Sequence, residues 1–264
     1  MRMVAMLKIG ETPYVSTLPL YWPMRTRLGE GREFVSGRLT DLSSALAKGE
    51  IDVGPITLVE YLRKPDNFQV LPELSLSSLG RSGCMLLYTR KPVYELKESR
   101  IAVPGWAVGP IALLKWLMKE MYRFEPSLVE RLGSVEENLA QHDGVLMFQD
   151  QALKAAKGTS DLFHVWDLGE VWWQITNTPF IYMIWAARKS LPESDVAEVS
   201  DLFAEAKAAY PGVRQMVVAE AQNRVDMPAP VVEGYLSRFN YDFTPAHQSG
   251  LDSYEKTVLT LTTA

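Results

Sequence analysis

Hydroxyl-bearing side chains are concentrated in a short segment near the start of the chain, between an apolar strand pattern and a helix. Leu7–Gly10 has the composition of a short strand, and Pro19 can open the following helix because proline is tolerated in a first helical turn. Backbone N–H groups at such a strand-to-helix turn point outward and favour anions. We therefore expect this turn to bind a negatively charged ligand. Its candidate contacts are Tyr14, Ser16 and Thr17.

Three further turns have related features. The strand Ile51–Val53 runs into a Gly-Pro turn and then into a helix, near whose start Thr57 stands. The glycine-containing stretch Gly80–Cys84 precedes another strand, and Trp106–Pro110 precedes a helix in the middle of the chain. The last of these turns has no hydroxyl, so its backbone N–H groups would be the donors. The candidates in the three turns are Thr57, Ser82, Cys84, Trp106, Val108 and Gly109.

Some of the notable residues also have a simpler interpretation. Cys84 could line a ligand site or could be a buried thiol that packs in a strand, and without a linked histidine we do not expect a nucleophile. Asp150 is expected to be a helix N-cap rather than a ligand contact. Three tryptophans could form a ring-stacking wall or pack in the core, namely Trp172, Trp173 and Trp185.

The composition excludes several classes of protein. The net charge of 27 − 32 = −5 gives no electrostatic case for binding nucleic acid or an acidic membrane. The single cysteine excludes an internal disulfide framework, and the three histidines lack metal-ligand spacing, so we expect neither a metal nor a cofactor. No apolar run approaches the ~20 residues that span a bilayer, and Met1–Lys8 is too short for a signal peptide, so we expect a cytoplasmic protein.

Strand and helix patterns alternate along most of the chain and give way to helices at the end, which predicts an α/β fold with mixed, mainly parallel sheets. We expect two lobes joined by two crossing strands, near Tyr88–Lys91 and Ile184–Arg188, with the ligand in the cleft between the lobes. Lobe 1 would comprise residues 1–90 and 186–264, and lobe 2 residues 91–185. The C-terminal helices, expected to pack on lobe 1, are Ser194–Tyr210, Gly212–Gln222 and Pro228–Phe239.

Six stretches of sequence occur in a characteristic order and spacing. They are PYVSTLPL at Pro13–Leu20, GEIDVGPITLVEYLR at Gly49–Arg63, LPELSLSSLGRSGCMLLYTRKP at Leu71–Pro92, DGVLMFQDQAL at Asp143–Leu153, DLGEVWWQITNTPFIYMIWAAR at Asp167–Arg188 and FNYDFTPAHQSGLDSYEK at Phe239–Lys256. Together they resemble the menaquinone-biosynthesis dehydratases that act on chorismate in the futalosine pathway, over nearly the whole chain. The resemblance implies the two-lobe, type II fold of periplasmic solute-binding proteins.

The resemblance also implies a hydro-lyase that removes water from chorismate, a dianion, and leaves 3-[(1-carboxyvinyl)oxy]benzoate as the first step of the futalosine route to menaquinone. Under it, Ser16 is the catalytic candidate. The chain departs from the family's usual residues at four places. Ser16 stands where the family usually has asparagine, Cys84 and Thr57 stand where it usually has serine, and the Trp106–Pro110 turn lacks the usual serine and threonine. The implied substrate-binding residues are Tyr14, Thr17, Thr57, Ser82, Cys84, Trp106, Val108 and Gly109.

The four turns offer no obvious general base, since Glu11 is the only titratable group that accompanies them. We therefore expect the enolpyruvyl carboxylate of the substrate to take the ring proton, while the protein positions the substrate and excludes water. The alternative is a non-catalytic binding protein of the same fold for a small carboxylate, which the lack of a signal peptide disfavours. No nucleic-acid partner and no membrane insertion are expected, and a homodimer is left open.

Overall fold

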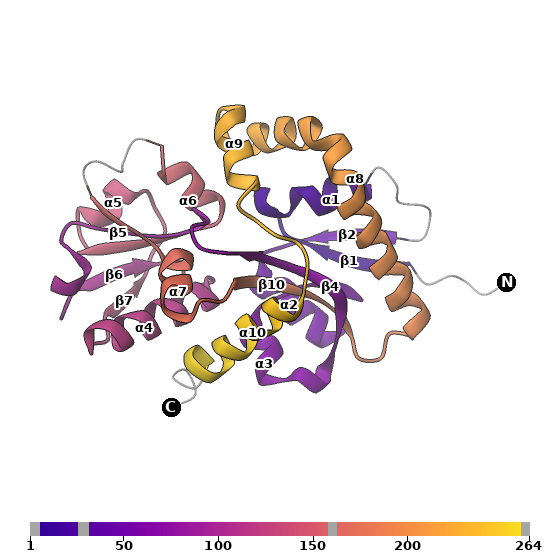
Figure 1. Ribbon diagram of the computed structural model, residues 1–264, viewed down its shortest axis with the longest axis horizontal. Coiled ribbons are helices and arrows are strands. Elements are labelled where there is room, and N and C mark those ends of the chain that lie inside the picture. Colours follow the sequence, from indigo (N-terminus) through magenta and orange to yellow (C-terminus); the bar gives the residue numbers. More distant parts are fainter. Residues whose placement is uncertain (1–5, 26–31, 158–162, 260–264) are drawn as a thin grey trace. The chain divides into compact units, whose positions relative to one another are not determined.

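The computed structural model (Figure 1) describes residues 6–25, 32–157 and 163–259 of the chain. No helix within these ranges is long and apolar enough to cross a membrane. Met1–Ala5, part of the segment judged too short for a signal peptide, lie outside the described residues. Contacts within the chain divide it into two compact units. The first comprises residues 1–77, 181–236 and 240–244, and the second residues 78–180, 237–239 and 245–264.

Five strands form the mixed sheet of the first unit, namely β1 (Leu7–Glu11), β2 (Arg32–Ser36), β3 (Val53–Ile56), β4 (Phe68–Ser78) and β10 (Phe180–Arg188). Their order in the sheet is β2-β1-β3-β10-β4. β1 pairs in parallel with both β2 and β3, whereas β10 runs antiparallel to β3. The C-terminal ends of β1, β2 and β3 therefore lie at one edge of the sheet, which is where ligands bind in parallel sheets.

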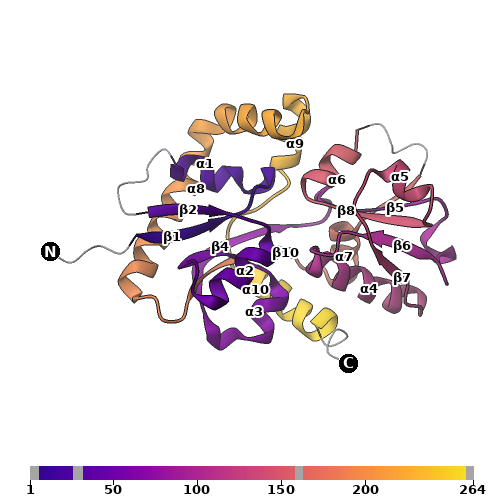
Figure 2. The same ribbon diagram turned by 180° about the vertical axis from the view of Figure 1, so that it is seen from behind.

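Helices cover both faces of this sheet, namely α1 (Leu18–Arg25), α2 (Leu39–Lys48), α3 (Leu58–Arg63), α8 (Glu193–Val225) and α9 (Ala229–Leu236). Figures 1 and 2 show α1, α8 and α9 on one face and α2 and α3 on the other. A short 3-10 helix, Pro65–Asn67, precedes β4. α2 ends at Gly49, whose φ of 73° is left-handed, a conformation that costs little in a residue without a Cβ.

The long helix α8 corrects one expectation. The sequence predicted two helices, Ser194–Tyr210 and Gly212–Gln222, but one helix of 33 residues runs through Pro211. Pro211 has no N–H, so the helix continues through it with one hydrogen bond fewer. Figures 1 and 2 show the helix changing direction along its length, as a proline in a helix interior causes.

Five strands also form the mixed sheet of the second unit, namely β5 (Met85–Thr89), β6 (Arg100–Val103), β7 (Ser127–Glu130), β8 (Gly144–Phe148) and β9 (His164–Asp167). Their order is β7-β6-β8-β5-β9. β6 is parallel to β7 and β8, and β5 is antiparallel to β8 and β9. The C-terminal ends of β6, β8 and β9 therefore lie at the same sheet edge as the N-terminal end of β5.

The helices of the second unit are α4 (Val108–Tyr122), α5 (Val135–Leu139), α6 (Asp150–Ala155), α7 (Leu168–Thr176) and α10 (Pro245–Tyr254), with a 3-10 helix at Val93–Glu95 and a π-helix at Glu255–Leu259. α10 was expected on lobe 1 but belongs to this unit. The Tyr254 ring lies 5.9 Å from that of Phe180 and 6.2 Å from that of Trp172, centroid to centroid. This aromatic cluster holds the end of α10 in the second unit.

The boundaries between the units also differ from the expected ones, residues 1–90 and 186–264 against 91–185. Met85–Thr89 was assigned to lobe 1, but β5 lies inside the second sheet and all five of its residues are buried. A strand in a sheet that is covered on both faces has buried residues throughout, so its apolar run does not reveal which sheet it joins. The predicted α/β class with mixed sheets is confirmed.

Candidate functional site

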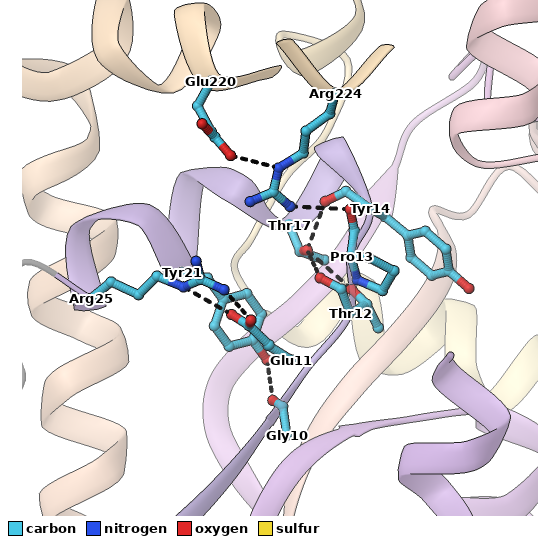
Figure 3. A network of polar contacts seen from close by, with 10 residues as sticks. All are labelled: Gly10, Glu11, Thr12, Pro13, Tyr14, Thr17, Tyr21, Arg25, Glu220 and Arg224. Carbon is cyan, nitrogen blue, oxygen red and sulfur yellow. Dashed lines mark hydrogen bonds and ion pairs between the residues drawn. The ribbon is translucent and has the colours of Figure 1, made fainter. Parts of the chain in front are cut away.

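The turn after β1 carries the first group of predicted site residues (Figure 3). The chain passes through Thr12 into a 3-10 helix, Val15–Thr17, which leads directly into α1. The Thr17 hydroxyl donates to the carbonyl oxygen of Tyr14 at 2.9 Å and lies 3.0 Å from the Thr12 hydroxyl. Because a hydroxyl has one proton, Thr12 is then the donor to Thr17. The Thr17 side chain thus stabilises the turn from within.

Ser16 and Tyr14 are both buried in this turn. Ser16 has no exposed surface, and its backbone carbonyl accepts a hydrogen bond from the hydroxyl of Tyr241 at 2.8 Å. The Tyr14 carbonyl accepts hydrogen bonds from both the amide and the hydroxyl of Thr17. Ser16 and Tyr14 therefore lie in the turn where the sequence predicted them, and their contact with a ligand stays a prediction.

Glu11, the titratable group that the sequence identified beside this turn, is buried at the end of β1. Its carboxylate accepts hydrogen bonds from two nitrogens of the Arg25 guanidinium, one of them at 3.2 Å. Such a bidentate pair engages both carboxylate oxygens. Because Arg25 donates to both carboxylate oxygens of Glu11, this carboxylate is not available as a general base.

A cavity of about 170 Å³ lies beside the same turn, between α1 and α8 (Figure 3). Its wall contains two ion pairs, Glu11 with Arg25 and Glu220 with Arg224, so the charges in the wall balance. Arg224 also donates to the carbonyl oxygen of Pro13 at 3.2 Å. The cavity has no excess of positive charge to select an anion, and Arg224 instead connects α8 to the turn.

The turn after β3 ends at Thr57, which is the N-cap of α3. Its Oγ1 atom accepts a hydrogen bond from the Glu60 amide at 3.1 Å, and its own amide donates to the Ser43 hydroxyl oxygen at 3.1 Å. The Thr57 hydroxyl proton has no acceptor among the described residues. Because β1 and β3 are parallel neighbours, Thr57 emerges at the same sheet edge as the turn at residues 12–17. Thr57 therefore retains a hydrogen-bond donor for a ligand.

In the second unit, Asp167 connects two turns that are far apart in sequence. Its Oδ1 atom caps α7 by accepting hydrogen bonds from the amides of Gly169 and Glu170, at 2.9 and 3.2 Å. Its Oδ2 atom accepts hydrogen bonds from the amides of Ser82 and Gly83, at 3.0 and 2.6 Å. Burial raises the pKa of the Asp167 carboxyl, and these four hydrogen bonds oppose the rise. One carboxylate thus fixes the turn before β5 to the start of α7.

Ser82 and Cys84 are completely buried in that turn. The Ser82 hydroxyl accepts a hydrogen bond from the amide of Cys84 at 3.2 Å and lies 3.4 Å from its sulfur. The carbonyl of Cys84 accepts a hydrogen bond from the amide of Gln149 at 2.8 Å. Ser82 and Cys84 therefore help to build the turn, and the burial of Cys84 agrees with the simpler interpretation, a packing thiol.

The start of α4 offers two backbone donors. The helix begins at Val108, and the preceding N-cap residue, Ala107, has no capping side chain. Pro110 has no N–H, so the first turn presents the amides of Val108 and Gly109. No residue that the structure describes accepts a hydrogen bond from either amide. Because the N-terminus of a helix favours negative charge, the two amides can bind an anion.

Trp106 stands in the same turn, half-buried, with its ring centroid 5.6 Å from that of Phe148 at the end of β8. The next residue, Gln149, is buried and has a φ of 53°, which non-glycine residues rarely adopt. The sequence predicted Asp150 as the N-cap of α6, but this was wrong, since Gln149 is the N-cap and Asp150 begins the helix. Strained backbone of this kind is frequent at functional sites.

The remaining candidates divide between core and surface. Trp172 and Trp185 have no exposed surface, which confirms the core interpretation for both, whereas Trp173 is 39% exposed. In the parts of the chain that the structure describes, no three histidine, cysteine, aspartate or glutamate side chains could hold a metal ion. Sequence reasoning missed Asp167 and Tyr241. An aspartate followed by a helical pattern could have indicated the cap at Asp167, but no local signal links either residue to a turn.

The predicted site residues thus form two groups. Tyr14, Ser16, Thr17 and Thr57 lie at one edge of the first sheet, and the others lie at one edge of the second sheet: Ser82, Cys84, Trp106, Val108 and Gly109. Both groups stand where parallel strands end, which is the usual place for ligand contacts in such sheets.

Comparison with known proteins places the chain in a family. The model of the menaquinone biosynthesis family matches residues 7–258. The chain belongs to this family. A curated relative, the chorismate dehydratase of Thermus thermophilus, is 27% identical over 260 residues, which cover 93% of each chain.

Solved structures show the same fold at lower sequence identity. Protein AF1704 of Archaeoglobus fulgidus has a TM-score of 0.80 at 16% identity and covers 100% of both chains. The periplasmic aliphatic sulphonate-binding protein SsuA of Escherichia coli has a TM-score of 0.66 at 16% identity, covering 95% of this chain and 86% of its own. The menaquinone biosynthesis protein thus has the predicted periplasmic-binding-protein-like fold.

Proposed function

We propose that this protein catalyses the dehydration of chorismate to 3-[(1-carboxyvinyl)oxy]benzoate. The observation that carries the proposal is the family match over residues 7–258, together with a relative along 93% of the chain that is named chorismate dehydratase. Fold alone would not separate an enzyme from a binding protein, because solute-binding proteins share this fold.

The donors at the two sheet edges suit a dianion. In the first unit, the Thr57 hydroxyl retains a proton to donate, and in the second unit, the amides of Val108 and Gly109 point from the start of a 15-residue helix. Hydrogen bonds to charged groups are stronger than those to neutral groups, so few donors suffice for each carboxylate. We propose that these donors contact the two carboxylates of chorismate, with Ser16 beside the reacting ring.

The chemistry requires a ring C–H bond and a C–O bond to break, so that a proton and hydroxide leave as water and the ring becomes aromatic. Among the described residues, two carboxylates are buried, and both are engaged, Glu11 by Arg25 and Asp167 by four backbone amides. This supports the enolpyruvyl carboxylate of the substrate as the proton acceptor. The protein would contribute orientation and exclusion of water.

A chorismate analogue without the enolpyruvyl carboxylate tests that step. We expect the analogue to bind more weakly and, at saturation, to lose water far more slowly than chorismate. Turnover of the analogue at the rate of chorismate would contradict the substrate-assisted step without contradicting the dehydration itself.

The proposal extends to two further predictions from the sequence, which are a place at the first step of the futalosine route and a cytoplasmic location, and a homodimer is left open. The family match supports a role in menaquinone biosynthesis, from which the first of them follows if chorismate is the substrate.

Incubation of the purified protein with chorismate tests the function. We expect a product lighter than chorismate by one water, with the absorbance of a substituted benzoate, and no such product from chorismate alone. Calorimetric titration with chorismate, run in parallel, distinguishes the enzyme from a non-catalytic binding protein. A binding protein would bind chorismate tightly and leave its mass unchanged.

A further inference from the structure

The backbone of the turn after β1 is held through its carbonyl groups by side chains from remote segments (Figure 3 shows part of this network). Arg224 of α8 donates to the carbonyl oxygen of Pro13 at 3.2 Å. Tyr241, which is 225 positions away in sequence, donates to the carbonyl oxygen of Ser16 at 2.8 Å. Both contacts are made with main-chain atoms, so they constrain the path of the turn whatever its side chains are.

A carbonyl that is fixed also fixes the amide of the next residue. In a planar trans peptide the C=O of one residue and the N–H of the next point in opposite directions. The hydrogen bond to the Ser16 carbonyl therefore orients the amide of Thr17, which donates to the carbonyl oxygen of Tyr14 at 3.1 Å. The hydroxyl of Tyr241 thus controls the last turn of backbone before α1.

Tyr241 is itself held firmly by β4. The Ser75 amide donates to the Tyr241 carbonyl oxygen at 3.1 Å, and the neighbouring residue Asn240 forms an antiparallel bridge with Ser77. Burial raises the pKa of the Tyr241 hydroxyl well above its usual value, so the hydroxyl stays protonated and remains a donor at physiological pH. A rigid donor of this kind is suited to positioning, since it has little freedom to follow a moving partner.

We propose that Tyr241 is a positioning residue that holds Ser16 and its turn in the geometry that chorismate dehydration requires. The proposal rests on the proposed function, because that function supplies the reaction. The hydrogen bond from Tyr241 and its effect on the turn do not depend on which reaction the protein catalyses. A misplacement of about 1 Å at a reacting group can lower turnover by about 100-fold, so even a partial relaxation of the turn has a measurable effect.

Tyr241→Phe removes only the hydroxyl. We expect kcat for chorismate to fall by about tenfold while KM changes by less than about twofold, because the donors proposed for the carboxylates stay in place. A role in stability alone would lower the melting temperature and leave kcat at the wild-type value.

Tyr21→Phe is the matched control in the same unit. The Tyr21 hydroxyl is also buried, donates to the Gly10 carbonyl oxygen at 2.7 Å and accepts a hydrogen bond from Trp185 at 2.8 Å. Gly10 lies in β1 and not in the turn, so this variant should lose stability at least as much as Tyr241→Phe and keep kcat within about twofold.

Hydrogen exchange separates this proposal from the proposed function. In Tyr241→Phe the Thr17 amide should exchange about tenfold faster than in the wild type, relative to the amide of Ala221 in α8, whether or not chorismate is a substrate. If the wild-type protein does not dehydrate chorismate, the proposed function is contradicted. Hydrogen exchange at the Thr17 amide then still tests whether Tyr241 positions the turn. Unchanged exchange at Thr17, or an unchanged kcat in an active protein, would overturn the proposal for Tyr241.

Discussion

The Oδ2 atom of Asp167 lies 2.6 Å from the amide nitrogen of Gly83, across 84 positions of sequence. The same atom accepts the amide of Ser82, while Oδ1 caps α7. Because the two oxygens serve two different turns, a change at Asp167 can release one turn and keep the other. Substitutions at Asp167 can therefore test separately how each of these two contacts stabilises the second unit.

Asp167→Asn should release the turn before β5. The amide oxygen of asparagine can still cap α7, but its NH₂ group then faces the amides of Ser82 and Gly83, two donors without an acceptor. We expect a loss of about 1–3 kcal/mol in the free energy of unfolding, measured by urea denaturation. Asp143→Asn is the control, because among the described residues only the Arg100 amide donates to its carboxylate, at 3.0 Å, and asparagine can turn its oxygen to that donor. If Asp143→Asn lost as much free energy of unfolding as Asp167→Asn, the role of Asp167 in fixing the turn before β5 would be contradicted.

The pKa of Asp167 also predicts a dependence of stability on pH. Its carboxyl has a raised pKa in the folded protein, so between the usual value of 3.8 and the raised value the folded chain binds more protons than the unfolded chain. The contribution of this group to the free energy of unfolding is therefore fully present below 3.8 and falls as pH rises through the raised pKa. The wild type should lose stability relative to Asp167→Asn as urea titrations move from about pH 4 to about pH 7. If the free energy of unfolding of the wild type instead rose with pH relative to that of Asp167→Asn, the pKa of Asp167 would be lowered in the folded protein and not raised.

Thr57→Ala removes an N-cap and, under the proposed function, a substrate contact. Ser134→Ala removes an N-cap of the same kind, because the Ser134 hydroxyl oxygen accepts the Glu137 amide at 3.1 Å at the start of α5. Both variants should lose about 1 kcal/mol in the free energy of unfolding. Thr57→Ala alone should raise KM for chorismate, by about tenfold, and Thr57→Ser should restore it. Equal kinetics in the two alanine variants would remove Thr57 from the binding site.

Ser16 is the position at which this chain departs from the usual asparagine of the family it resembles. Ser16→Ala should lower kcat by about tenfold, as the loss of one hydrogen bond to a charged substrate would. Its free energy of unfolding should change by less than about 1 kcal/mol. Ser16→Asn should preserve or raise kcat if the serine hydroxyl stands in for an amide. A Ser16→Ala variant with wild-type kinetics would show that Ser16 takes no part in the reaction.

Local features of the fold could be predicted because their causes are local. Gly49 ends α2 through its own left-handed backbone, and Thr57 caps α3 through an amide three residues away. The turn at residues 12–17 was predicted from its hydroxyls and from Pro19, which depend on a few neighbouring residues. Such features are encoded in short stretches of sequence, so one chain suffices to find them.

Long-range relationships could not be predicted in this way. The contacts of Asp167 with Ser82 and of Tyr241 with Ser16 span 85 and 225 positions, and nothing near either residue indicates its partner. β5 was assigned to the wrong lobe because a fully buried strand has no polar face to show its neighbours. Pro211 was expected to end a helix, but the 33-residue helix continues through it, and no local pattern shows whether the packing of a long helix outweighs one lost hydrogen bond.

The mass of the product formed from chorismate by the purified wild-type protein tests the central claim most directly. We predict time-dependent conversion to 3-[(1-carboxyvinyl)oxy]benzoate, lighter than chorismate by one water, at a rate proportional to protein concentration and with no added metal or cofactor. Chorismate that binds to the protein and is recovered with its mass unchanged would contradict the proposed dehydration and would support a binding protein instead.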